Sequence, residues 1–93
     1  MNLVDFIPYG HKNAITSNQL GMLTGLSSRD IRKIISQAKR DTLIVNLQDG
    51  KGYFKPTEDE RELVKRYLKQ EESRFKTIAW TLHSAREFLE NGG

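Results

Sequence analysis

Apolar and polar positions follow a helical period in three stretches of the chain, each of which begins with a capping sequence. In the first stretch, Thr16 and Gln19 have the spacing of a capping box, in which each side chain bonds to the other residue's backbone. Leu20 and Leu23 supply an apolar face for this short helix. Gly25 is predicted to end it, because glycine adopts the left-handed conformation at low cost.

A second helix is predicted over 28–40, after a further capping box at Ser27-Ser28-Arg29-Asp30. Its apolar residues recur at i, i+3, i+4 and i+7, which places them on one face. They are Ile31, Ile34, Ile35 and Ala38. The opposite face is cationic and polar, and it carries Arg29, Arg32, Lys33, Ser36 and Arg40. The pattern therefore predicts an amphipathic helix with a basic outer surface.

Short strands are predicted next. The segment 43–47 is apolar and β-branched, 48–52 has turn composition, and 53–55 reads as a second strand that ends at Pro56. Together these segments predict a β-hairpin around Asp49-Gly50.

The C-terminal third is predicted to form one helix over about 58–90, roughly 50 Å long at 1.5 Å per residue. Its apolar residues form a heptad seam. The seam positions are Val64, Leu68, Glu71, Phe75, Ile78, Leu82, Ala85 and Leu89. The first half of the helix is expected to close the core through Leu63, Val64, Tyr67 and Leu68. The second half is expected to form a homodimer interface through Phe75, Ile78, Leu82, Ala85 and Leu89. The alternative is a break near Glu71–Ser73 that would give a helical hairpin.

The turn Gly25-Leu26-Ser27 separates the two short helices, and Gly21 provides a small residue one turn before it. Apolar residues stand at the offsets that join two such helices, namely Leu20, Leu26, Ile31 and Ile34. This arrangement resembles the helix-turn-helix pattern of DNA-binding proteins over residues 17–36.

With the predicted hairpin, the chain resembles the small winged-helix proteins of phages and prophages of Gram-positive bacteria over residues 7–57. The residues that carry this resemblance are Ile7–Gly10, Asn13–Thr16, Gly25–Arg29, Asp49-Gly50 and Gly52–Phe54. The expected fold is mostly α with a small β-hairpin: a winged helix-turn-helix in residues 1–56, followed by a long C-terminal helix in 57–93 of the same domain. Ala14-Ile15 is expected to add to the wing sheet.

Winged helices normally have a further helix ahead of the motif. Pro8 and Gly10 leave little room for one here, so Leu3–Ile7 is expected to form only a short arm or a single turn. The first part of the C-terminal helix is expected to take the place of the missing element in the core.

The charge distribution adds a functional indication. The net charge of the 93 residues is +3, and residues 1–56 hold 8 basic and 4 acidic side chains against 7 and 8 in residues 57–93. A basic cluster on one helix is typical of a nucleic-acid-binding surface. The chain has no cysteine, which excludes disulfides and thiol chemistry, and its two histidines lie far apart. We expect a cytoplasmic protein with no membrane segment, no metal, no cofactor and no enzymatic activity.

The resemblance implies a protein that binds double-stranded DNA in phage or prophage replication or transcription regulation. The early residues of helix 28–40 would enter the major groove, with Arg29 and Arg32 reading bases. The full predicted contact set is Thr16, Ser17, Ser28, Arg29, Arg32, Lys33, Ser36, Arg40 and Lys51, the last at the tip of the wing. One alternative is a nonspecific architectural DNA-binding protein. Another is a protein-interaction module that docks on a host or replication protein through Tyr9, Trp80 and Phe88 without binding DNA.

Overall fold

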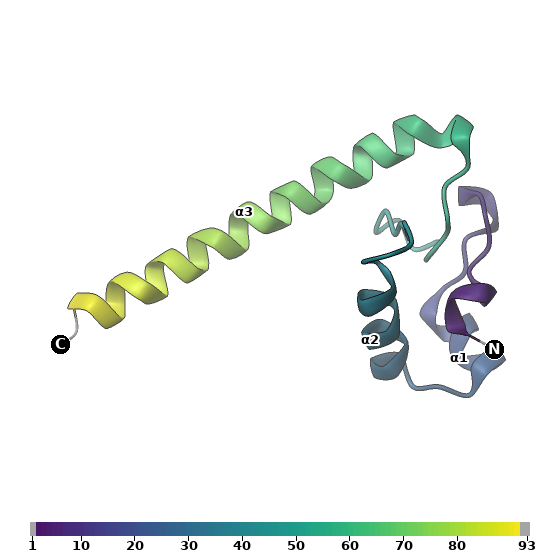
Figure 1. Cartoon of the computed structure of the whole chain (residues 1–93), viewed down its shortest axis with the longest axis horizontal. Coiled ribbons are helices and arrows are strands. Elements are labelled where there is room, and N and C mark those ends of the chain that lie inside the picture. Colours follow the sequence, from purple (N-terminus) through teal and green to yellow (C-terminus); the bar gives the residue numbers. More distant parts are fainter. Residues whose placement is uncertain (1, 92–93) are drawn as a thin grey trace.

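The computed structural model describes residues 2–91, and most of them are helical (Figure 1). The elements are the 3₁₀ turns η1 (Leu3–Phe6) and η2 (His11–Asn13), the helices α1 (Ser17–Thr24) and α2 (Ser28–Ala38), the 3₁₀ turn η3 (Glu58–Glu60) and the helix α3 (Arg61–Asn91). The radius of gyration is 16.5 Å, against about 12 Å for a compact domain of this length. The difference arises because α3 leaves the rest of the molecule as a single long rod (Figure 1).

The helices α1 and α2 begin at the predicted caps. The Thr16 hydroxyl accepts a hydrogen bond from the Gln19 N–H at 3.1 Å, and the Gln19 side chain accepts one from the Thr16 N–H at 2.9 Å. Ser27 caps α2 by accepting from the Asp30 N–H. Gly25 ends α1 with φ +75°, as predicted.

The helix α2 is two residues shorter than the predicted 28–40. It ends at Ala38, whose carbonyl accepts from the N–H groups of both Asp41 and Thr42. Arg40 therefore lies in the turn that follows α2 rather than on the helix.

The first apolar core joins α1 and α2 to the N-terminal segment. Its buried residues are Leu3, Ile7, Leu20, Ile31, Ile35 and Ile44. The single turn η1 contacts both α1 and α2, and Leu3 and Ile7 at its two ends are 5% and 2% exposed. In this cluster η1 takes the place predicted for the C-terminal helix, whose Leu63 and Tyr67 pack instead against a second cluster of buried residues. The single turn ahead of Pro8 is enough to close the first cluster, because it brings two large apolar side chains, Leu3 and Ile7, to the same side of the chain.

The predicted β-hairpin does not form, so the winged-helix assignment is wrong. No residue within 2–91 belongs to a β-strand, and Val45 and Phe54 make the one bridge between the two predicted strands. A hairpin ladder extended from this bridge would next pair residue 47 with residue 52 and residue 43 with residue 56. Pro56 has no N–H to donate. Gly52 turns away with φ +102°, and the side chains of Asn46 and Asp49 accept the N–H groups of Gln48 and Lys51. These local bonds replace a ladder.

Three successive residues instead pair with three separate segments. Tyr53 exchanges two backbone hydrogen bonds with Ile15 (2.7 and 2.9 Å), and Phe54 exchanges two with Val45 (2.9 and 3.0 Å). Lys55 donates to the Pro8 carbonyl and accepts from the Gly10 N–H. Ile15 thus pairs with the second predicted strand, but through an isolated bridge rather than in a sheet.

The second apolar cluster positions α3. It consists of the buried residues Val45, Leu47 and Phe54, against which Leu63 and Tyr67 of α3 pack. The other two predicted core residues of this helix lie elsewhere, since Leu68 is 56% exposed and Val64 lines a surface pocket. The helix continues without interruption through Glu71–Ser73, so the alternative of a helical hairpin is excluded.

We expect two nearby glycine substitutions to differ sharply in effect. Gly50 and Gly52 both have positive φ, but a Cβ on Gly50 would meet no atom within 4 Å, whereas one on Gly52 would lie 2.2 Å from the Ile15 carbonyl oxygen. Gly50→Ala should therefore lower the free energy of unfolding by about 1–2 kcal/mol, from backbone strain alone. Gly52→Ala should lower it by more than about 3 kcal/mol, since the Ile15–Tyr53 pairing must also move.

Denaturant unfolding followed by the amide NMR signals of α2 measures both changes. Equal losses in the two variants would show that the segment near Ile15 does not approach Gly52 closely.

Candidate nucleic-acid interface

The outer face of α2 is basic and exposed, while its inner face is locked into the core. Ile31 and Ile35 are 0% and 2% exposed. Successive residues of an α-helix are about 100° apart, so Arg29, Lys33 and Ser36 point away from these isoleucines, and all three are exposed. Within residues 2–91 the ion pairs are His11–Asp49, Lys65–Glu62, Arg74–Glu71 and His83–Glu87, none of which uses a basic residue of α2.

Arg32 and Ser36 border a cleft on the flank of α2. This cleft has a volume of about 240 Å³ and lies between α2, the 46–53 segment and α3. Lys39 contributes to the same cleft, and its ammonium stands 5.5 Å from the centre of the Tyr67 ring. From α3 come Glu71 and Arg74, which are paired at 3.3 Å. The predicted base-reading residue Arg32 thus lies among further cations rather than beside Arg29.

Thr16 and Ser17 border a neighbouring cleft of about 220 Å³. Asn46, Gln48 and Tyr53 line both clefts. The start of α1, the polar 46–53 segment and the flank of α2 therefore form one continuous surface. The N–H and hydroxyl of Thr16 already donate to the Gln19 side chain, at 2.9 and 3.3 Å. Ser28 is exposed at the first position of α2.

The remaining two predicted contacts lie outside these clefts. Arg40 is exposed in the turn after α2, and Lys51 is exposed in the 48–52 turn. Lys51 does not stand at the tip of a wing, since no hairpin is present in the described residues. Its N–H donates to the Asp49 carboxylate, which is itself held by His11. This turn is therefore attached to the body of the molecule.

His11 connects the 48–52 turn to η3, which directly precedes α3. Its Nε2 lies 2.7 Å from the Asp49 carboxylate, its ring lies 5.2 Å from that of Phe54, and its N–H donates to Glu60 at 2.8 Å. The hydrogen bond from His11 lowers the pKa of Asp49. The N–H groups of His11 and Thr57 lower the pKa of Glu60.

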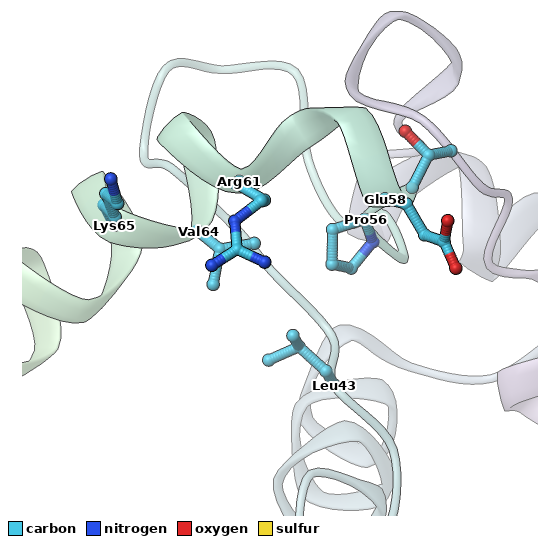
Figure 2. Close-up of a pocket in the computed structure, with 7 residues that line it drawn as sticks. Leu43, Pro56, Glu58, Arg61, Val64 and Lys65 are labelled. Atoms are coloured by element: carbon cyan, nitrogen blue, oxygen red, sulfur yellow. The ribbon is translucent and has the colours of Figure 1, made fainter.

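A further pocket, of about 730 Å³, lies on a different part of the surface, between the turn after α2 and the first turns of α3. Figure 2 shows Arg61 and Val64 above Leu43, with Pro56 beside them and Glu58 on the far side. Its floor is apolar, and Val64, the first seam position, belongs to it. The pocket thus marks the point where the seam of α3 meets the body of the protein.

The second half of α3 is exposed along its whole length in the described residues 2–91. The predicted interface residues Phe75, Ile78, Leu82 and Leu89 are 71%, 55%, 51% and 75% exposed, and Ala85 is also exposed. Trp80 on the opposite side of the helix and Phe88 on its flank are exposed as well. Tyr9, the third aromatic residue of the predicted interaction set, is 64% exposed beneath the Lys55 ammonium.

Sequence reasoning missed the residues that reach the clefts from outside the two short helices. Asn46 and Gln48 belong to the predicted strand and turn, and Arg74 lies 35 positions beyond Lys39 on the helix that carries the apolar seam. The spacing of charges along the sequence does not indicate that Arg74 lines the same cleft as Lys39. The link between His11, Asp49 and Glu60 was also missed, because its members come from three separate segments.

Comparison with protein-family models, curated proteins and solved structures found no match for this chain. None of the helices in the described part combines the length and apolar character that crossing a membrane requires. Residues 2–91 contain no group of three or more histidine, aspartate or glutamate side chains placed to hold a metal ion.

The pairing of His11 with Asp49 predicts a specific acid sensitivity. Because the pKa of folded Asp49 lies below its ordinary 3.8, the pair stabilises the fold above that pH and loses its contribution as the pH falls through the lower, folded value. The destabilisation caused by Asp49→Asn should therefore be largest near about pH 5 and should shrink as the pH is lowered from there. Urea unfolding of both proteins across this range measures the change, and a pH-independent difference would contradict the assignment.

Proposed function

We propose that the protein binds double-stranded DNA with α2 lying in the major groove. The observation that carries this proposal is the basic outer face of α2, which makes no ion pair within residues 2–91, while Ile31 and Ile35 on its inner face are buried. Cations without carboxylate partners are available to phosphates and base edges. A helix anchored by Ile31 and Ile35 presents them in a fixed arrangement.

The dimensions of α2 and its surroundings suit this role. Eleven residues span roughly 16 Å, and the major groove is about 12 Å wide, which admits one helix. We assign the base contact to Arg29, whose guanidinium fork matches guanine, whereas Arg32 borders the cleft between α2 and α3. Lys33 and Arg40 are assigned to phosphates, as are the polar groups at the start of α1. Lys51 is left out of the interface, since its assignment depended on a wing.

We further propose that two copies associate through the seam of α3. Phe75, Ile78, Leu82, Ala85 and Leu89 lie on one side of a helix that its own domain leaves uncovered. Exposed apolar stripes of this kind are usually interfaces, and spacings of three and four residues match the seam between two paired helices. A dimer would present two α2 helices to two half-sites about 10 base pairs apart or a multiple of that. The role in phage or prophage replication or gene control is part of the same proposal.

Two substitutions on α2 should separate base reading from phosphate binding, once a preferred site has been selected from random duplexes. Arg29→Ala should cost about 1–3 kcal/mol on that site and relax the preference at one base pair. Lys33→Ala should weaken binding to all duplexes alike and reduce the slope of affinity against salt by about one unit. Lys69→Ala, on the outer side of α3, is the matched control for the lysine. Fluorescence anisotropy titrations at several salt concentrations supply the measurements.

The results also separate the competing functions. A strong salt dependence without any sequence preference would indicate an architectural DNA-binding protein. A failure to retard any duplex at low salt would rule out DNA binding and favour the protein-interaction module, for which Tyr9, Trp80 and Phe88 are exposed.

The dimer is tested by adding one charge to each side of α3. Leu82→Glu places a carboxylate on the seam and should shift the mass from about twice 10.7 kDa to the single value. Ser84→Glu places the same charge about 200° around the helix and should leave the dimer intact. Light scattering at tens of micromolar distinguishes these outcomes. A monomeric parent protein would refute the proposal.

A further inference from the structure

We infer that the cleft between α2 and α3 is a phosphate-binding site, built from Arg32 and Lys39 of the α2 segment together with Arg74 of α3. The inference rests on the proposed DNA-binding function. It adds a contact from α3 to those proposed for α2. In the complex the site would hold one phosphate of the DNA backbone beside the groove that α2 enters.

The charge of the cleft favours an anion. Three cations and one carboxylate line it, which leaves a net charge of +2. The carboxylate of Glu71 is already paired, since the Arg74 Nη1 lies 3.3 and 3.5 Å from its two oxygens and the Gln70 side chain also donates to it at 3.5 Å. Arg32 and Lys39 make no ion pair within residues 2–91, although the Arg32 Nε donates to the Ser28 carbonyl at 3.4 Å.

Neutral donors complete the cleft. Ser36 provides a hydroxyl and Gln48 a side-chain amide, and both line the same space. The volume of about 240 Å³ exceeds the roughly 30 Å³ that one water occupies in the liquid, so a phosphate group fits with part of its hydration shell. Guanidinium groups with hydroxyl and amide donors are the common protein partners of backbone phosphates.

The position of Arg74 is held by contacts on the preceding turns of α3. Tyr67 packs against the second apolar cluster and lies beneath the Lys39 ammonium. One turn later the Gln70 side chain donates to the Asn46 carbonyl at 2.9 Å. Both contacts fix the rotation of α3 at the level of the cleft. Arg74 is therefore presented to the cleft by the fold, which is the arrangement that a binding site requires.

Two charge-removing substitutions on α3 test the site. Arg74→Gln should reduce the slope of log affinity against log salt by about 0.9 on every duplex, as expected for one lost phosphate contact. Arg66→Gln removes the same charge from the same helix at an exposed position that lines no part of the cleft, and it should leave the slope nearly unchanged. Arg74→Lys, which keeps the charge, should restore most of the slope. Equal effects of Arg74→Gln and Arg66→Gln would overturn the inference while leaving recognition by α2 in place.

A second measurement distinguishes a DNA phosphate from a free one. Inorganic phosphate is added to the parent protein while the Nε–H signals of its arginines are followed by NMR. We expect the Arg32 and Arg74 signals to move and that of Arg66 to stay. If phosphate moves these signals but the parent protein binds no duplex in the titrations, the cleft is a binding site for free phosphate and the proposed DNA-binding function is refuted. If phosphate moves none of these signals and Arg74→Gln leaves the duplex titrations unchanged, the site itself is refuted.

Discussion

The fold depends on three backbone pairings made by the consecutive residues Tyr53, Phe54 and Lys55. Each residue bonds a different segment, so 53–55 lies between the N-terminal segment on one side and Val45 on the other. Hydrogen-bonding directions alternate along an extended chain, which allows residues 53 and 55 to face one neighbour while residue 54 faces the opposite one. The close approach of Gly52 to the Ile15 backbone makes this arrangement possible, since any side chain there would meet main-chain atoms.

This central segment also separates the two apolar clusters. Ile44 points into the cluster around α1 and α2, and its neighbour Val45 points into the cluster beneath α3. The first cluster holds α2 by its inner face. The second holds only the opening turns of α3, through Leu63 and Tyr67. The rest of α3 extends away from the body, and this leaves its apolar seam available to another molecule.

The two proposed activities therefore occupy different parts of one chain and share α3. The early part of the helix adds Arg74 to the basic flank of α2, and the late part presents the seam. Because α3 is continuous from Arg61 to Asn91, pairing of two seams would set the separation of the two recognition helices in a dimer. The turn formed by residues 48–52, attached through His11 and Asp49, contributes to the body of the molecule.

Features that depend on neighbours three or four positions apart were determined by the sequence itself. The Thr16 cap, the stop at Gly25, the buried face of α2 and the continuous C-terminal helix all arise from local spacing, and they could be read without a structure.

The hairpin was misread because apolar β-branched composition shows that a segment is extended but not which partner its backbone will find. The pairing partner depended on Pro56, which has no N–H, and on the positive φ of Gly52. It also depended on side chains that accept hydrogen bonds from N–H groups of the turn. The closure of the core by Leu3 and Ile7, and the placement of Arg32 and Arg74 along one cleft, were decided only by the tertiary structure. Both features bring together residues that lie far apart in the chain. The direction of α3 relative to Phe54 follows from how side chains pack, and no local sequence pattern encodes that packing.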